Sequence, residues 1–352
     1  MRQAHRAAAR IGAWFDRIDP GTHRRIKGLR LVTAFGLAAM LATVPEIADG
    51  RGVMVGTLAA GFALWASVSE AQTTRYESAR DLLLLCLAAG GGAASFAVFA
   101  IPLGAGWEEL TLVSGSFCVG YLRRYGTLGA GIGSQIFIGQ LLAYSAGTTV
   151  ADLSTVALAV VLAILASVVP RMLSGPAEQP AIAPPLPQPE GATIFSEIVM
   201  GLQATIASLS IVVLGWAVGM TQSAWAITAC TYVVANSTVG TIDRVRRRIG
   251  GTLIGVPLGL ACLPVASHAP LLIWGAAAIA MIIYAMALPE RYDIACGAYA
   301  FALVVTMAAT GEYSFVTLAA RAWETIVGGA LGIAVVLSLS QLPSLLQHDK
   351  QK

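Results

Sequence analysis

Two charged residues lie close together in a stretch of the chain that is otherwise apolar. Arg321 and Glu324 are three positions apart, so on a helix they share one face. A charge deep in such a stretch is costly, and it tends to be paired or to face a cavity. Two interpretations are open. Either the residues form a structural ion pair, or Arg321 binds a passing anion while Glu324 holds the arginine or takes up a proton.

The same arginine belongs to a pattern that occurs twice. Residues 248–255 read RIGGTLIG and residues 321–328 read RAWETIVG, so both follow R-x-x-[G/E]-T-x-x-G, which we call the arginine–threonine motif. On a helix the arginine, the threonine and the glycine lie on one face. The glycine permits close helix approach, and the threonine can hydrogen-bond across the contact. We therefore predict a helix-packing role for Thr252, Gly255, Thr325 and Gly328.

Arginines also stand at the ends of apolar segments, namely Arg80, Arg124, Arg248 and Arg291. A carboxylate that crosses a bilayer needs fixed cations and hydrogen-bond donors along its path. Arginine offers a planar fork that matches a carboxylate and keeps its charge. The alternative role is topology and contact with lipid headgroups. Aromatic side chains could stack on an aromatic substrate or anchor the protein at the interface; the candidates are Tyr125, Tyr292, Tyr299 and Trp225.

The composition excludes several classes of protein. Of the 352 residues, 57% are hydrophobic and 12% are charged, about half the charge of a soluble domain. This excludes a cytosolic enzyme, a nucleic-acid binder and a secreted disulfide scaffold. The five cysteines lie in apolar stretches without metal-ligand spacing, and no lysine stands in a phosphate-binding loop. We therefore expect no enzymatic activity, no metal and no cofactor.

The apolar stretches predict an all-α membrane protein with about 12 transmembrane helices, because each span needs about 20 apolar residues. The predicted ranges are 30–48, 51–69, 82–103, 108–122, 127–147, 152–170, 197–219, 223–240, 249–267, 270–288, 294–311 and 314–342. With the N-terminus in the cytoplasm, all but Arg51 and Arg321 of the 22 lysines and arginines fall on the cytoplasmic side. This is the asymmetry that the positive-inside rule describes, and it places both termini in the cytoplasm.

The layout divides the chain into five parts. They are a basic amphipathic segment (1–29), a first six-helix repeat (30–170), a proline-rich cytoplasmic linker (171–195), a second six-helix repeat (196–342) and a cytoplasmic tail (343–352). An Arg-Tyr pair precedes the fifth span of each repeat, at Arg124-Tyr125 and Arg291-Tyr292. Because each repeat has an even number of spans, the two repeats are expected to be parallel, with a permeation path at the seam between them.

The segment from Trp225 through Asn236, Arg248, Gly251, Thr252 and Gly255 resembles the fusaric acid resistance (FUSC) family of inner-membrane proteins. That family includes aromatic acid exporters and is related to plant aluminium-activated malate transporters. The resemblance is clearest over roughly 220–340, where Arg291-Tyr292, Arg321, Glu324, Thr325 and Gly328 also fit. Residues 30–170 look like a diverged first copy.

The resemblance implies efflux of organic anions, such as aromatic carboxylic acids, from the cytoplasm across a bacterial inner membrane. It implies proton motive force as the energy source and a path between the repeats that is lined partly by arginines. Carried over by position, these are Arg80, Arg124, Arg248, Arg291 and Arg321. The expected partners are a small organic anion and the lipid bilayer, with a homo-oligomer or efflux accessory subunits left open and nucleic acid excluded.

Two other functions compete with this one. Residues 240–248 faintly resemble a charged loop motif of the major facilitator superfamily, although the aspartate spacing is one short and a glycine is missing. The other alternative is a non-transporting membrane assembly or scaffold subunit. It arises because FUSC proteins often carry a cytoplasmic domain after each six-span block, whereas this chain has a short linker and a short tail.

Overall fold

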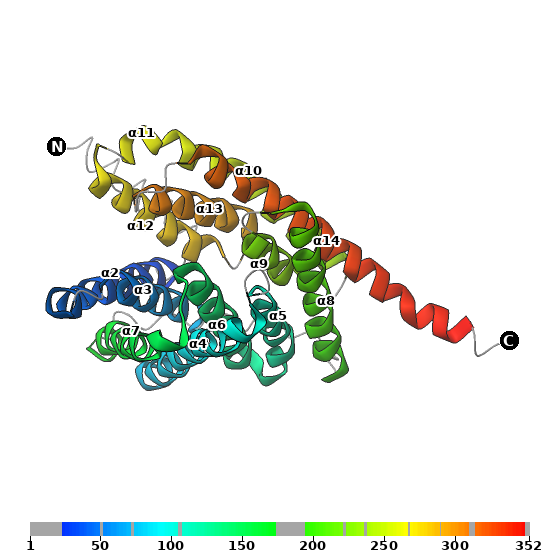
Figure 1. The fold of residues 1–352 in the computed structure, drawn as a ribbon, viewed down its shortest axis with the longest axis horizontal. Helices are drawn as coiled ribbons and strands as arrows, with labels where there is room; N and C mark the ends of the chain where they lie inside the picture. The colour runs from blue at the N-terminus through cyan, green and yellow to red at the C-terminus, as the bar shows by residue number, and fades with distance from the viewer. Residues whose placement is uncertain are drawn as a thin grey trace, which may run out of the picture.

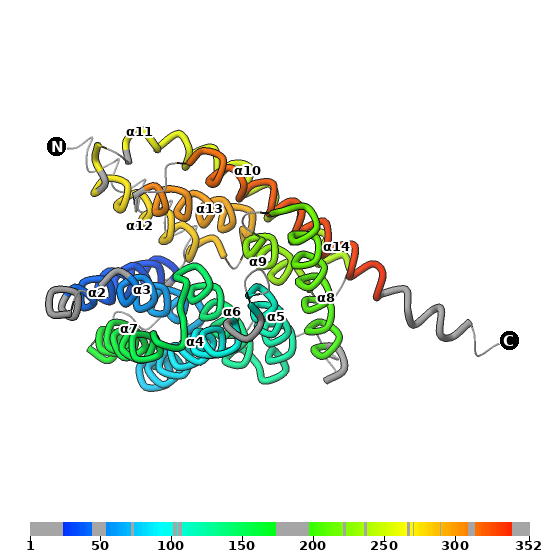
Figure 2. The backbone as a smooth tube through the Cα atoms, in the orientation of Figure 1, coloured from blue at the N-terminus to red at the C-terminus, as the bar shows by residue number. Residues whose placement is uncertain are grey.

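The computed structural model describes residues 23–49, 52–71, 74–104, 108–173, 194–220, 223–235, 238–266, 268–288, 290–309 and 314–348. Most of the predicted amphipathic segment and of the linker, and Asn236, lie outside these ranges. Within them every regular element is a helix (Figure 1, Figure 2). The all-α prediction is therefore confirmed for the described part of the chain.

The helices form two groups in space (Figure 1). The first group consists of α2 (His23–Asp49), α3 (Gly52–Ser69), α4 (Arg75–Leu103), α5 (Leu110–Tyr121), α6 (Gly126–Ala146) and α7 (Leu153–Leu173), with the short 3-10 helices η1 (Leu122–Tyr125) and η2 (Val150–Asp152). The second group consists of α8 (Ile194–Val218), α9 (Ser223–Val233), α10 (Thr238–Ala261), α11 (Leu263–Ala266), α12 (Pro270–Ala287), α13 (Tyr292–Ala309) and α14 (Phe315–His348). We call the boundary between the two groups the seam.

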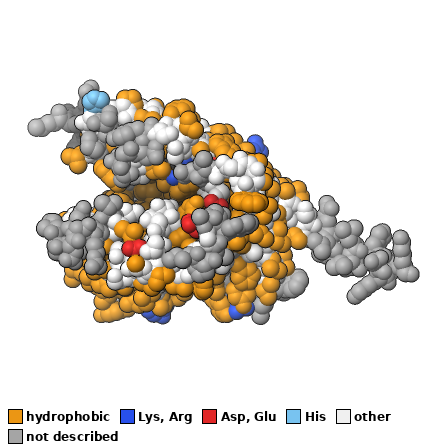
Figure 3. Space-filling model, viewed as in Figure 1, with side chains coloured by type: hydrophobic (Ala, Val, Ile, Leu, Met, Phe, Trp, Pro, Cys, Tyr) orange, Lys and Arg blue, Asp and Glu red, His pale blue; other side chains and the backbone are white. Residues whose placement is uncertain are grey.

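The helices identify a multi-pass membrane protein. By length and composition, 6 helical segments in the described residues can cross a membrane, and three shorter apolar helices accompany them. Hydrophobic side chains cover most of the described surface on one face of the molecule (Figure 3). Large apolar residues are exposed on helices, including Leu271, Val316 and Val239, as lipid contact requires.

The predicted total of about 12 spans exceeds that number of segments, and helix length is one reason. α5 has 12 residues and α9 has 11. A helix of that length covers about 18 Å, little more than half the thickness of a bilayer core. An apolar stretch in the sequence therefore does not always become a helix that crosses the membrane alone.

Several helices begin before their apolar stretch does. α10 starts at Thr238, so the arginines of residues 244–248 lie on a helix, and the prediction that they occupy a loop is wrong. Arginine is a good helix former, and the Asp243 carboxylate pairs with Arg247 one turn later at 2.9 Å. α4 likewise starts at Arg75, which places Arg80 on a helix. These extended helix starts fix the directions in which the arginine side chains leave the backbone.

The helices of the two groups pack in similar ways. In the first group α4 packs against α6 and α7, and in the second group α10 packs against α13 and α14. Across the seam, α2 packs against α12, and α5 packs against α8. Two hydrophobic clusters seal these contacts: one joins Leu112 and Phe137 to Ile211, and the other joins Leu31 to Met281. The seam is therefore closed by apolar packing on two flanks.

Basic side chains gather at one end of the molecule and connect helices there. The Arg24 guanidinium donates to the Glu290 carboxylate at 2.5 Å, which lowers the pKa of Glu290. Arg247 donates to the carbonyl of the same residue at 3.3 Å. At the start of α4, the buried Ser78 hydroxyl accepts a hydrogen bond from Arg171 of α7 at 2.9 Å. The starts of α2, α4, α10 and α13 therefore share what we call the basic end.

Candidate functional site

A small cavity lies inside the second group, between α9, α10, α13 and α14. We call it the Arg321 pocket; its volume is about 30 Å³, and its lining includes Trp225, Arg248, Thr252, Tyr299, Arg321 and Thr325. Both arginine–threonine motifs thus contribute to one cavity, one from α10 and the other from α14. The sequence revealed the two motifs but not that they meet.

Glycine sets how closely the helices around the pocket approach. A Cβ atom at Gly255 would collide with the carbonyl oxygen of Gly297 on α13. A Cβ atom at Gly328 would collide in the same way with the carbonyl of Ala226 on α9. Thr325 differs from the expectation of a bond across the contact, because its hydroxyl donates to the carbonyl of Arg321 on its own helix at 2.8 Å.

Arg321 is buried at the pocket, where its side chain is 5% exposed. The guanidinium carbon lies 3.3 Å from the centre of the Trp225 ring, a cation–π contact. Nη2 donates to the Met307 sulfur at 2.8 Å, whereas Nε and Nη1 have no hydrogen-bond partner among the described residues. A guanidinium fork with unfilled donors beside a cavity has the chemistry to bind an anion.

Glu324 lies on the same helix but has different neighbours. It is fully buried, and it acts electrostatically on both Arg321 and Tyr144 of α6 in the first group. No hydrogen bond between the Arg321 and Glu324 side chains occurs among the described residues. The Tyr144 hydroxyl donates to Glu109 at 3.0 Å, so the carboxylates of Glu324 and Glu109 both lie near the same tyrosine at the seam.

The remaining polar groups of the pocket connect it to the basic end and to the first group. Arg248 is half-buried, and its Nη1 lies 3.4 Å from the hydroxyl of Tyr292. The Tyr299 ring packs edge-on against Trp65 of α3, with ring centres 5.5 Å apart, and also lies near Tyr284. Through Trp65 the first group reaches the edge of a pocket whose lining comes from the second group.

One comparison with known proteins identifies the region that contains the pocket. Residues 209–335 match the family described as fusaric acid resistance protein-like. Over this segment the chain is similar to the FUSC family. The match runs from α8 into α14 and contains every residue that lines the Arg321 pocket. No curated protein and no solved structure matches the chain.

This similarity to the FUSC family suggests a membrane transport role for the protein. The matched FUSC segment also covers α10, including the charged stretch that faintly resembles a major facilitator motif. This favours the FUSC interpretation of the stretch. Arg248 is the last residue of this stretch, and its side chain lines the Arg321 pocket.

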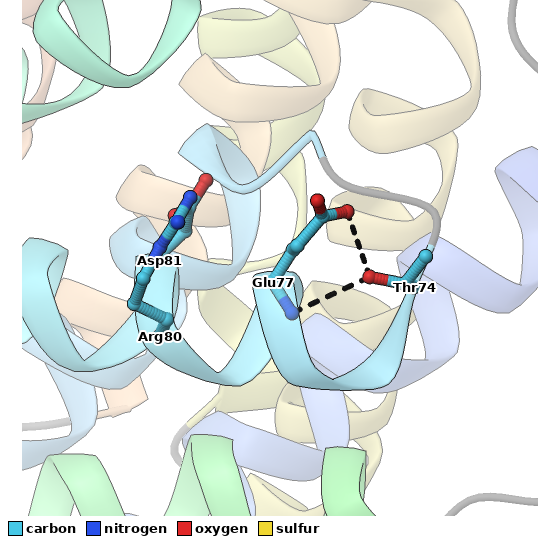
Figure 4. A network of polar contacts seen from close by, with 4 residues as sticks. All are labelled: Thr74, Glu77, Arg80 and Asp81. Atoms are coloured by element: carbon cyan, nitrogen blue, oxygen red, sulfur yellow. Dashed lines mark hydrogen bonds and ion pairs between the residues drawn. The ribbon is translucent and has the colours of Figure 1, made fainter.

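Four of the predicted site residues lie away from the Arg321 pocket, on the surface of the basic end; they are Arg80, Arg124, Tyr125 and Arg291. Arg80 is exposed and pairs with Asp81 at 2.9 Å, next to the Thr74–Glu77 hydrogen bonds that open α4 (Figure 4). Arg124 lies over the ring of Tyr121 and donates to the hydroxyl of Tyr125, which is exposed. Arg291 is exposed and pairs with Asp293 at 2.8 Å. The Arg291–Asp293 pair is exposed on both sides and contributes little energy, whereas the Asp81 carboxylate that Arg80 pairs with is buried.

Two side chains near the Arg321 pocket were not predicted as site residues. Met307 accepts the hydrogen bond from Arg321, and Trp65 covers Tyr299 from the first group. A methionine in an apolar helix reads as core, and a tryptophan near a span end reads as an interface anchor. The sequence therefore carries no signal that separates these two residues from ordinary structural ones.

Proposed function

We propose that the protein exports organic anions such as aromatic carboxylic acids across the bacterial inner membrane, driven by the proton motive force, with both termini in the cytoplasm. Arg321 is the observation that carries this proposal. Its guanidinium side chain is buried, and two of its nitrogens lack a described hydrogen-bond partner. Charges are retained at such depth where they serve a substrate path or a partner.

The chemistry of the pocket supports an aromatic acid over a simple inorganic anion. The guanidinium fork of Arg321 can hold a carboxylate, and the Trp225 and Tyr299 rings offer faces and edges to an aromatic ring. Arg248 adds a second positive charge on the side of the basic end. A substrate with a carboxylate and a ring would use both features.

The pocket is closed to such a substrate in this structure. A volume of about 30 Å³ has room for a water molecule but not for an aromatic ring. We therefore expect transport to require a rearrangement that widens the pocket. The similar helix packing of the two groups supports two parallel repeats that rock against each other, with the path opening at the seam beside Trp65.

Flux into proteoliposomes tests the function directly. Under an imposed pH gradient, labelled benzoate, hydroxybenzoates and dicarboxylates should show protein-dependent flux, with the aromatic acids fastest. Collapse of the gradient by a protonophore should remove accumulation above equilibrium. If folded protein moves none of these anions, the non-transporting scaffold becomes the better explanation.

The exposed arginines should contribute little to that flux. We expect Arg80→Gln and Arg291→Gln to retain initial rates within about twofold of wild type, because both guanidinium groups are exposed and neither lines the Arg321 pocket. Initial rates of 4-hydroxybenzoate flux at equal protein per vesicle are the measurement. A tenfold lower initial rate in either variant would show that this arginine is part of the substrate path.

A further inference from the structure

A second cavity lies on the seam itself, and we call it the seam pocket. It has a volume of about 50 Å³ and is lined by both groups: Gly120 and Arg123 come from the first, and Met200, Thr231 and Arg244 from the second. It shares no lining residue with the Arg321 pocket. Arg123 stands on η1, which follows α5, and Arg244 stands on the first turns of α10.

Among the described residues, the two arginines of the seam pocket use few of their hydrogen-bond donors. Arg123 Nη1 lies 3.8 Å from the Met200 sulfur, which is a weak acceptor. Arg244 Nη1 donates to the carbonyl of Val234 at 3.3 Å. A guanidinium presents five N–H donors, so most of each fork is left for another acceptor.

The charge of the seam pocket is also incompletely balanced. Burial, together with the like charge of Arg244, lowers the pKa of Arg123, and the Glu197 carboxylate on α8 opposes this. Glu197 is buried and is the one carboxylate among the groups that act electrostatically on Arg123 in the described residues. Two arginines and one glutamate leave a net charge of +1. An anion in the pocket would remove the repulsion between the two guanidinium groups.

We propose that the seam pocket is a second anion site, in which the carboxylate of an organic acid bridges Arg123 and Arg244. The volume suits a carboxylate group, and the two arginines can each offer paired donors to it. The inference deepens the proposed function and rests on it, since it makes this pocket the place where the exported acid first binds at the basic end. Because one arginine comes from each group, a bound carboxylate also joins the groups across the seam.

Thermal unfolding of the full chain in phosphatidylcholine nanodiscs tests the site, with tryptophan fluorescence as the signal and sodium benzoate as the probe. A ligand that binds only the folded state raises the unfolding temperature. The titration is run in an Arg321→Ala background, so that the Arg321 pocket contributes nothing. We expect benzoate to stabilise this protein, and expect Arg123→Gln or Arg244→Gln to raise the half-saturating concentration at least about tenfold. The matched control is Arg246→Gln, an exposed arginine on the same helix, which should leave it unchanged.

A charge reversal gives a second, independent result. In Arg244→Glu the chain supplies its own carboxylate to Arg123, so the unfolding temperature without benzoate should rise and the response to benzoate should disappear. An unchanged benzoate response in both glutamine variants overturns the proposal. The proposal is also overturned if the unfolding temperature rises only when the nanodisc contains phosphatidylglycerol and does not change with benzoate, because the site then holds a lipid phosphate. Failure of the proposed function is detected in a different experiment: wild-type proteoliposomes would then show no anion flux.

Discussion

Replacing Arg321 with alanine should lower the flux of aromatic carboxylates about 100-fold or more, because the variant loses the charged fork and leaves the substrate carboxylate without compensation in an apolar site. The side chain is 5% exposed and stands over Trp225 at the pocket. Initial rates in proteoliposomes at matched protein density measure the effect. Arg321→Lys should retain only part of the rate, since lysine keeps the charge but lacks the planar fork.

Arg291→Ala is the matched control for this substitution. It also removes one arginine from the second group, but that arginine is exposed and pairs with Asp293. Each variant must first elute as a single folded species in detergent. Wild-type flux in Arg321→Ala would leave Arg321 with a structural role only, whereas equal losses in both variants would point to a general effect of charge.

The second large effect is expected at the contact between α10 and α13. Gly255→Leu should destabilise the protein by about 3 kcal/mol, because the new side chain meets the carbonyl of Gly297 and the two backbones must separate. The change also moves Arg248 and Thr252 relative to Tyr299, so flux should fall with stability. Thermal unfolding of the protein in nanodiscs measures the first effect.

Gly250→Leu is the control for the glycine substitution. Gly250 lies on the same helix, is exposed, and has no atom within 4 Å of the position that a Cβ would occupy. The added leucine should face lipid and leave the unfolding temperature unchanged. If both leucine variants unfold at the same temperature as wild type, close approach at Gly255 is not what holds α10 against α13.

Local sequence predicted several features of this site. The arginine–threonine motif at residues 248–255 and 321–328 marked Arg248, Thr252, Arg321 and Thr325, which line the Arg321 pocket. The same residues carried the resemblance to the FUSC family, which the match over residues 209–335 confirms. Both signals depend on spacing along one helix, where neighbours at positions i, i+3 and i+4 share a face whatever the rest of the fold does.

Other parts of the site could not be predicted in this way. Arg80, Arg124 and Arg291 share with Arg248 a position at the cytoplasmic end of a predicted span, yet only Arg248 of these lines the Arg321 pocket. The positive-inside rule selects the end of the membrane on which an arginine stands, and it carries no information about direction around the helix. In the sequence, Arg123 and Arg244 look like other arginines that stand next to predicted spans, and nothing marks them as site residues.

The sequence by itself predicted a helical membrane protein similar to the FUSC family, with its arginines between the apolar stretches, because hydropathy, charge and motif spacing are local properties of the chain. The tertiary structure alone decided which arginines are buried and which of them meet. Arg248 and Arg321 share a pocket because glycines bring α10 close to α13 and α14 close to α9. Arg123 and Arg244 meet because the two groups close on the seam, and such contacts between distant segments depend on which helix faces pack together.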